Sequence, residues 1–301
     1  MGSPDFSVPI LEGLTQEFQV VGVVTQPDRP SGRGRKMTPP PVKELADKLG
    51  IAVMQPLKLR APEAFEQLAG WHPDAIVVVA FGQILRQNVL ELPPCGCINV
   101  HASYLPRWRG AAPIQAAIMS GDEATGVSIM RMDAGIDTGP VYKQVKEPIR
   151  AEDTAHSLSM RLSALGRETL LEVLPAILAG DLAANEQNGE ATYASMLKKE
   201  DGLLDWNKPA AELERLVRAY NDWPGAYTFW KDQLLKIRQV KVIDVAEFIM
   251  PGTRFLYQGL PAISTGEKSL CLVEVQPAGK KWMGGKDFLN GNPDWAGEKR
   301  V

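Results

Sequence analysis

Short apolar runs alternate with amphipathic segments over the first two-thirds of the chain. The β-branched run Phe18–Thr25 predicts a strand, and the continuous apolar run Asp74–Ala80 predicts a strand buried on both faces. Apolar residues recur every three or four positions over Pro41–Leu49 and Thr154–Leu178, which predicts two helices, the longer one with Asp153 as its N-cap. Further strands are expected at Cys97–Val100, Gly126–Met130 and Val141–Val145.

Strands that alternate with helices in this way predict an α/β fold. We expect a Rossmann-like, mostly parallel sheet with helices on both faces, formed by residues 1–180. In such a sheet, ligands bind beyond the carboxyl ends of the strands. Residues 181–207 are polar and have little periodicity, and we interpret them as a linker.

The last third of the chain has a different pattern. One helix is expected over Pro209–Tyr220, followed by short strands separated by turns at Leu234–Ile243, Arg254–Tyr257 and Ser269–Val275. This pattern predicts a smaller second domain over residues 208–301, built as an OB-like β-barrel.

Composition narrows the class of protein. The 301 residues carry 33 basic and 36 acidic side chains, and 45% of the residues are apolar, which excludes a disordered or fibrous chain. No apolar run approaches the ~18–20 residues needed to span a bilayer, and no secretory signal is visible. We therefore expect a cytoplasmic enzyme or binding protein.

Cysteine and histidine are scarce. Only one residue separates Cys95 from Cys97, and neither a zinc set nor a disulfide framework is apparent, so no metal is expected. The charge is uneven, because residues 1–207 hold 19 basic and 25 acidic side chains and residues 208–301 hold 14 and 11. A mildly basic C-terminal part favours a polyanionic partner only weakly, and ordinary scatter of surface charge is the alternative.

The candidate chemistry lies between residues 98 and 139. Asn99 and His101 are two positions apart at the end of a predicted strand, so their side chains leave the same face. Asp137 lies in a turn flanked by Gly135 and Gly139 after another predicted strand. An amide and an imidazole that stabilise an oxyanion, with a carboxylate that moves a proton, suit acyl transfer. A structural histidine, a turn-forming aspartate and a backbone-bonded asparagine remain open alternatives on these residues alone.

The stretch Asn99–Pro106, with Arg107–Gln115 and Asp133–Gly139, resembles the signature of the folate-dependent formyltransferases. The resemblance extends along the whole chain and is closest to the members whose acceptor is methionyl initiator tRNA. It rests on an ordered series of further segments: Gly2–Pro9, Gln26–Lys36, Ala80–Leu85, Lys198–Trp206, Tyr220–Tyr227 and Gln276–Gly291.

The resemblance implies roles for individual residues. Asn99, His101 and Asp137 match the family's formyl-transfer site, with 10-formyltetrahydrofolate as the donor and the α-amino group of methionine on the initiator tRNA as the acceptor. The implied mechanism has Asn99 and His101 donating hydrogen bonds to the formyl oxygen, while Asp137 orients His101 and relays the proton of the amine. The implied folate-contacting residues are Ser103, Tyr104, Leu105 and Pro106, together with Phe81, Gly82, Gln83, Ile84 and Leu85. The implied tRNA-contacting residues are Arg33, Arg35 and Lys36.

Two other functions stay open at this point. The same folate chemistry would serve a formyltransferase or hydrolase with a different acceptor, such as an amino-sugar nucleotide, a purine-pathway amine or water. A non-catalytic RNA-binding protein that kept the fold is a third reading, against which the retention of Asn99, His101 and Asp137 argues.

The sequence departs from the family's pattern in two places. Tyr104 stands where the family usually has leucine, so a larger side chain lies beside the expected folate site. The family also has a short hydrophobic strand ahead of the Met1-Gly2 turn, whereas this sequence begins at that turn. We therefore expect the natural start to lie upstream, since loss of a strand from the sheet would leave backbone groups unpaired.

Overall fold

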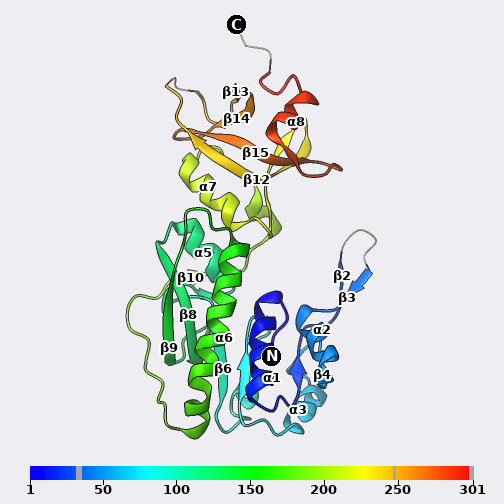
Figure 1. The fold of residues 1–301 in the computed structure, drawn as a ribbon, viewed down its shortest axis with the longest axis vertical. Helices are drawn as coiled ribbons and strands as arrows, with labels where there is room; N and C mark the ends of the chain where they lie inside the picture. Colours follow the sequence, from blue (N-terminus) through cyan, green and yellow to red (C-terminus); the bar gives the residue numbers. More distant parts are fainter. Residues whose placement is uncertain (32–35, 247–248, 298–301) are drawn as a thin grey trace. The chain divides into compact units, whose positions relative to one another are not determined.

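The computed structural model describes residues 1–31, 36–246 and 249–297. By their internal contacts these residues form two compact units (Figure 1). The first unit comprises Met1–Pro113, Ala124–Pro148 and Ser159–Ser195, and the second comprises Ile114–Glu123, Ile149–Leu158 and the chain from Met196 onward. Residues 181–195 of the predicted linker thus belong to the first unit. None of the helices in the described ranges is both long enough and apolar enough to cross a membrane.

The first unit consists of strands covered by helices. Its elements are η1 (Asp5–Ser7), α1 (Val8–Glu17), β1 (Val23–Val24), β2 (Arg29–Ser31), β3 (Lys36–Thr38), α2 (Pro41–Lys48), β4 (Val53–Met54), α3 (Pro62–Ala69), β5 (Ile76–Val78), α4 (Gln87–Leu90), β6 (Cys97–His101), β7 (Arg109–Gly110), β8 (Ala124–Arg131), β9 (Val141–Pro148), the greater part of α6 (Ala155–Ala179) and β10 (Tyr193–Ala194).

The main sheet has the strand order β5-β6-β8-β9. Strands β5 and β6 are parallel, as expected, and so are β1 and β4. Strands β8 and β9 extend the sheet in the antiparallel sense, so this edge of the sheet is mixed rather than parallel. The connection Met132–Pro140 between β8 and β9 is too short for the crossover helix that a parallel pair needs.

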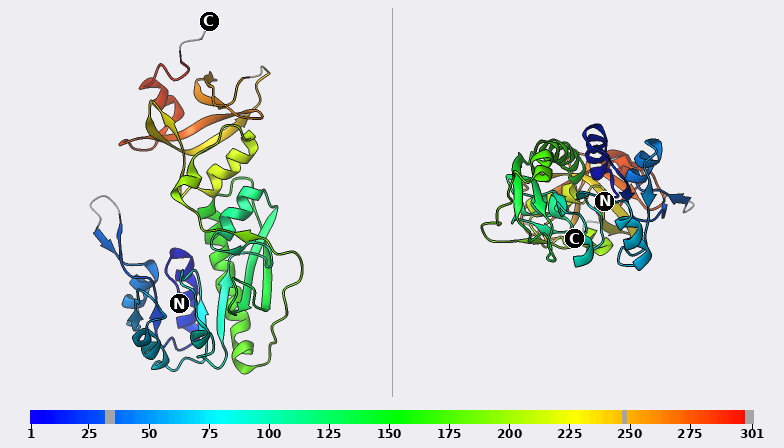
Figure 2. Two further views of the ribbon diagram at one scale, coloured as in Figure 1. Left: turned by 180° about the vertical axis from the view of Figure 1, so that it is seen from behind. Right: turned by 90° about the horizontal axis from the view of Figure 1, so that it is seen from below.

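Helix α6 lies close to β6 and β8 because Gly166 has no side chain. A Cβ atom at Gly166 would lie 2.8 Å from Val100 on β6 and 3.7 Å from Val127 on β8. Helix α1 meets α6 in a similar way, since a Cβ at Gly13 would lie 2.8 Å from Leu171. Both views of the ribbon show α1 and α6 side by side against β6 (Figures 1 and 2). This packing fixes the strand that carries Asn99 and His101.

The first two residues lie in the sheet between β1 and β5. The Met1 amine donates to the Val77 carbonyl, the Val79 N–H donates to the Met1 carbonyl, and the Gly2 N–H donates to the Val24 carbonyl. A cavity of about 250 Å³ adjoins them, lined mostly by apolar side chains such as Phe18. The predicted strand Phe18–Thr25 accordingly forms ladder pairs only at Val23 and Val24.

The buried Met1 amine makes stability depend on pH. Burial lowers the pKa of this amine to about 6, from about 8 in an exposed chain. Between these two values the unfolded chain binds a proton that the folded chain does not, so the free energy of unfolding rises as pH rises from about 6 to about 8. The gain is at most about 2.7 kcal/mol at about 1.36 kcal/mol per pKa unit.

Urea unfolding at pH 6 and pH 8 measures this dependence. The matched control is a chain extended ahead of Met1, in which the same nitrogen is an uncharged amide. The pH dependence is expected to be weaker in the extended chain, whereas an equal dependence in both chains would contradict the assignment to Met1.

The second unit is built on an antiparallel sheet. Its elements are α5 (Pro113–Ser120), η2 (Lys199–Gly202), α7 (Ala210–Ala219), β11 (Ala226–Trp230), β12 (Gln233–Ile243), β13 (Arg254–Tyr257), β14 (Leu260–Ser264), β15 (Ser269–Pro277), β16 (Met283–Gly284) and α8 (Gly285–Asn290). The strand order is β11-β12-β15-β14-β13, with β16 paired to β15. Leu213, Leu272 and Trp295 belong to its core. Among the described residues β11 and β13 are not paired, so these strands do not form a closed barrel.

The start of α6 differs from the prediction. Thr154, rather than Asp153, caps the helix: its Oγ1 accepts from the Ser157 N–H at 3.2 Å, and the Ser157 Oγ accepts from the Thr154 N–H at 3.1 Å. Asp153 instead accepts from the Arg150 N–H at 2.7 Å and from the Ser157 hydroxyl at 2.8 Å. The hydroxyl at position 154 therefore takes the helix N–H that the carboxylate was expected to take.

Candidate functional site

The last residues of β6 carry two of the three predicted catalytic side chains. Asn99 and His101 are only 9% and 6% exposed, because the strand is covered on both faces. The antiparallel register pairs them with Met130 and Ser128 of β8. Their spacing of two residues places both side chains on one face of the sheet, as predicted.

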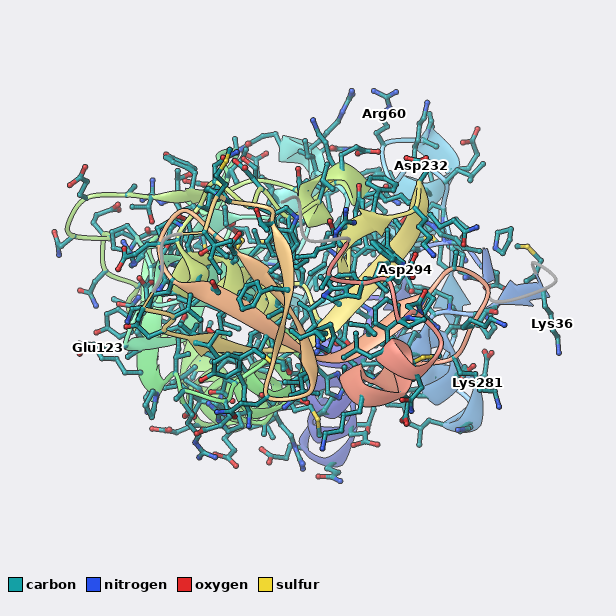
Figure 3. All side chains as sticks on the ribbon, turned by 90° about the horizontal axis from the view of Figure 1, so that it is seen from above. Lys36, Arg60, Glu123, Asp232, Lys281 and Asp294 are labelled. Atoms are coloured by element: carbon teal, nitrogen blue, oxygen red, sulfur yellow. The ribbon has the colours of Figure 1, made fainter. Side chains whose placement is uncertain are left out.

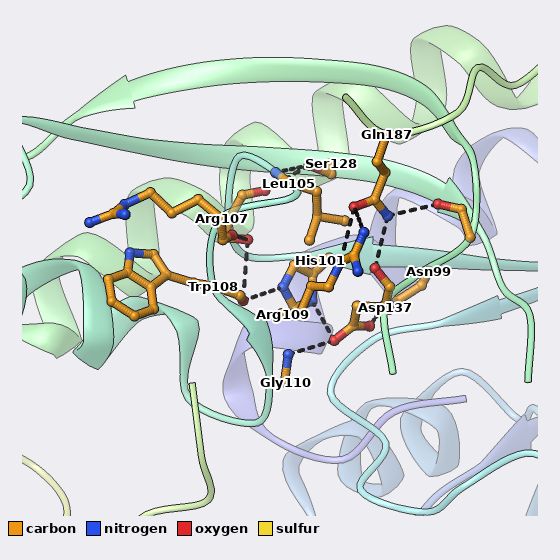
Figure 4. Close-up of polar contacts among 12 residues, drawn as sticks. Asn99, His101, Leu105, Arg107, Trp108, Arg109, Gly110, Ser128, Asp137 and Gln187 are labelled. Atoms are coloured by element: carbon orange, nitrogen blue, oxygen red, sulfur yellow. Dashed lines mark hydrogen bonds and ion pairs between the residues drawn. The ribbon is translucent and has the colours of Figure 1, made fainter. Parts of the chain in front are cut away.

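Asp137 lies in the connection after β8 and meets both of these side chains (Figure 4). Its Oδ1 accepts a hydrogen bond from Asn99 Nδ2 at 3.2 Å, and its Oδ2 lies 3.6 Å from His101 Nδ1. The Gly110 N–H donates to the same Oδ2 at 2.8 Å. The structure therefore brings together the three residues that the sequence singled out, and adds a backbone donor.

Gly110 can make this contact because it lacks a side chain. Its φ is 111°, and a Cβ at this position would lie 2.5 Å from the Ala194 carbonyl oxygen. Asp137 itself has a φ of 51°, in the left-handed region that aspartate adopts more readily than most residues with a side chain. Its backbone carbonyl is held by a hydrogen bond from Gln187 Nε2.

Both ring nitrogens of His101 face polar groups. Nε2 lies 3.0 Å from the Trp108 carbonyl oxygen, which can only accept, so Nε2 carries a proton. Nδ1 then faces the Asp137 carboxylate. The side-chain amide of Asn99 has two N–H bonds, and its hydrogen bond to Asp137 uses one of them. The second N–H is therefore left as a donor for a substrate.

The loop that follows β6 is held rigidly by hydrogen bonds. The Ser103 hydroxyl donates to the Arg107 carbonyl at 2.6 Å, and the Ser128 hydroxyl donates to the Ser103 carbonyl at 2.7 Å. Leu105 is buried, whereas Tyr104 is 37% exposed with Lys146 Nζ at 5.1 Å from its ring centre. The larger side chain at position 104 thus fits without displacing the core.

The other predicted folate-contacting segment, Phe81–Leu85, has both buried and exposed side chains. Phe81 and Leu85 belong to a hydrophobic core, and Gly82 has a φ of 77°. The Gln83 side chain accepts from the Leu59 N–H and donates to the Pro56 carbonyl. Ile84 is 87% exposed and is therefore the apolar side chain of this segment that is open to a ligand.

Of the three predicted tRNA-contacting residues, Lys36 is among the residues that the structure describes. Arg33 and Arg35 lie outside the described residues. Lys36 is exposed at the start of β3, and its side chain projects outward from the hairpin (Figure 3).

Several residues of the site were not predicted. The Trp108 carbonyl, the Gly110 N–H and the Ser128 hydroxyl act through the backbone or a small side chain, which a single sequence does not reveal. Arg109 and Gln187 also contact the site. Arg109 lies in the signature stretch Arg107–Gln115 but was given no role, and no motif included Gln187. In the described ranges, no three His, Cys, Asp or Glu side chains cluster as a metal site would require.

Comparison with known proteins agrees with the family resemblance of the sequence. Residues 2–174 match the family model described as formyl transferase, and residues 196–293 match the model for the formyl transferase C-terminal domain. The chain is 48% identical to a methionyl-tRNA formyltransferase of Geotalea daltonii, covering 97% of this chain and 94% of that protein. It is also 48% identical to a methionyl-tRNA formyltransferase of Myxococcus xanthus over the same share of each chain.

Among solved structures, the sugar 3N-formyl transferase WlaRD has a similar fold. That structure was determined in the presence of dTDP and 5-N-formyl-THF. The TM-score is 0.66 at 19% identity, covering 93% of this chain and 97% of that one.

Proposed function

Since this chain belongs to the formyl transferase family, we propose that it formylates the α-amino group of methionine carried by the initiator tRNA. The named relatives at 48% identity support this acceptor. The main support for the proposal is that the side chains of Asn99 and His101 both lie next to the Asp137 carboxylate in the first unit. Such an amide, imidazole and carboxylate can stabilise a developing oxyanion and move a proton.

The formyl donor we propose is 10-formyltetrahydrofolate, which supplies the formyl group and accepts a proton at N10. The determination of the WlaRD structure in the presence of 5-N-formyl-THF supports a donor of this class. The exposed Ile84 and the partly exposed Tyr104 offer apolar and aromatic surface to a pterin. The loop backbone near the folate would be that of Ser103, Leu105 and Pro106. The surface would be supported by the residues packed against it, which are Phe81, Gly82, Gln83 and Leu85.

The reaction requires one bond to form and one to break. The neutral amine attacks the formyl carbon, and the bond from that carbon to N10 breaks. The second N–H of Asn99 stabilises the negative charge that grows on the formyl oxygen. Asp137 takes the proton of the amine. Its Oδ2 lies 3.6 Å from Nδ1 of His101, and the Nε2 proton of His101 is taken by the Trp108 carbonyl rather than donated to the formyl oxygen as the sequence predicted. The proton then passes to N10 of the leaving folate.

The tRNA would be held by basic groups of both units. We propose that Arg33, Arg35 and Lys36 contact the acceptor stem and that the second unit, for which an OB-like barrel stays a prediction, binds the tRNA body. A cytoplasmic location and a monomeric state belong to the same proposal.

Arg33→Ala is expected to weaken the use of tRNA without changing the chemistry. Loss of one cation that contacts phosphate should raise KM for methionyl initiator tRNA by about 10-fold. The slope of log(kcat/KM) against the logarithm of the salt concentration should become less steep by about one. Steady-state kinetics at several salt concentrations measure both changes. The control is Arg60→Ala, which removes an exposed cation of the same unit (Figure 3). Equal kinetics for Arg33→Ala and the unaltered protein would reject the role of this loop.

A different acceptor is the remaining alternative within the family. Formyl transfer to methionyl initiator tRNA, to methionyl elongator tRNA and to an amino-sugar nucleotide, measured side by side, separates the alternatives. We expect transfer to the initiator tRNA alone. Transfer to the amino-sugar nucleotide instead would overturn the proposed acceptor while leaving the family assignment intact.

A further inference from the structure

The segment between α6 and the second unit contacts both loops of the candidate site. Asn185 exchanges two backbone hydrogen bonds with Val141, directly after the loop that carries Asp137. Further along, β10 pairs in parallel with β7, the segment that holds Gly110. The Thr192 hydroxyl also accepts from the Trp108 N–H at 2.9 Å. These residues, predicted as a linker from their polar composition, therefore join the two loops.

Gln187 is the side chain through which this segment holds the Asp137 loop. Its Nε2 donates to the carbonyl oxygens of Asp137 and Gly139, both at 2.8 Å. Its Oε1 accepts from Arg109 Nε at 3.2 Å and from Arg109 Nη2 at 2.8 Å. These contacts account for both N–H bonds and both lone pairs of the amide. Figure 4 shows Gln187 on one side of Asp137 and Gly110 on the other.

The Asp137 backbone needs such an anchor. Asp137 has a φ of 51°, and Gly135 and Gly139 lie two positions before and after it, so the loop backbone has wide conformational freedom. A carboxylate on a loop of this kind can point in several directions unless the backbone is held. The Arg109 fork fixes which end of the Gln187 amide faces the loop, because only the oxygen of the amide can accept from Arg109.

We propose that Gln187, oriented by Arg109, is a positioning residue that aims the Asp137 carboxylate at Asn99, His101 and the Gly110 N–H. This inference rests on the proposed function for its kinetic part. It assigns a role to a residue of the connecting segment that touches none of the reacting atoms.

A double-mutant cycle tests whether Gln187 acts through Asp137. The substitution Gln187→Leu removes the hydrogen bonds to the Asp137 and Gly139 carbonyls and keeps a side chain of similar length. We expect kcat to fall about 30-fold in the unaltered background, with KM for the folate changed by less than about threefold. In the Asp137→Asn background the same substitution should lower kcat by less than about threefold. Equal losses in both backgrounds, or no loss in either, would overturn the proposal.

A second measurement does not depend on activity. If Gln187 aims Asp137, the Gly110 N–H loses its carboxylate partner in Gln187→Leu, and its hydrogen exchange should become about tenfold faster. Unchanged exchange at Gly110 would contradict the proposal whether or not the protein formylates tRNA. Absence of turnover by the unaltered protein, in contrast, would refute the proposed function and not the positioning role.

The control is Ser163→Ala, which removes a hydrogen bond from a buried hydroxyl to the Phe6 carbonyl in the same unit. It should lower Tm without changing kcat or the exchange of Gly110. If Ser163→Ala and Gln187→Leu lower kcat equally, the effect of Gln187 is loss of stability and the proposal fails.

Discussion

Replacing Asp137 by asparagine is expected to lower kcat for formyl transfer by about 10²–10⁴-fold, the usual range for loss of a positioned proton-transfer group. Asparagine has nearly the same shape, and its oxygen can still accept from the Gly110 N–H. It cannot take a proton from the attacking amine, however. Single-turnover formylation with labelled formyl-folate measures the loss even when turnover is slow.

The matched control for this substitution is Asp133→Asn. Asp133 lies in the same connection, and its carboxylate accepts from the Thr138 hydroxyl and the Gly135 N–H rather than from Asn99. Activity of Asp133→Asn should stay within about threefold of the unaltered protein. A kcat for Asp137→Asn close to that of the control would show that the carboxylate moves no proton.

Removing the amide of Asn99 should have the second largest effect. Asn99→Ala is expected to lower kcat by about 10²–10³-fold, the typical loss of one oxyanion donor. Asn99 also donates to Asp137 Oδ1, so part of the loss comes from the carboxylate. Because the contact strengthens as charge grows on the formyl oxygen, KM for both substrates should change by less than about threefold. A rise in KM with an unchanged kcat would place Asn99 in ground-state binding instead.

The strand that carries Asn99 and His101 was predictable from the sequence because its signals are local. The apolar run that ends in Asn99 and His101 has the composition of a buried strand, and the two-residue period fixes the shared face of the two side chains. The turn around Asp137 follows from its flanking glycines. The distances from Asp137 to Asn99 and His101 depend on the register of β6 and β8, which local patterns do not specify.

The supporting residues were not predictable for a different reason. Gln187 is one polar residue in a polar segment, and its importance arises only when the chain returns to the Asp137 loop. Arg109 and Gly110 likewise gain their partners from β10, more than eighty positions later in the sequence. Composition alone made residues 181–195 an apparent linker, whereas backbone pairing makes them part of the first unit.

In the second unit, the three expected strands are present and three others, β11, β14 and the two-residue β16, were not predicted. β12, β13 and β15 coincide closely with the predicted segments. β11 (AYTFW) does have the composition of a strand, and it was missed because it directly follows a Gly/Pro-rich turn. β14 contains a proline, which weakens the signal of a strand, and pairing with β15 compensates for this weak local preference.

The most direct test of the account measures formyl transfer from 10-formyltetrahydrofolate to methionyl initiator tRNA, beside methionyl elongator tRNA, with the unaltered protein and Asp137→Asn. We expect rapid formylation of the initiator tRNA, little formylation of the elongator tRNA, and loss of about 10²–10⁴-fold in kcat for Asp137→Asn. Equal activity on both tRNAs, or none on either, would contradict it.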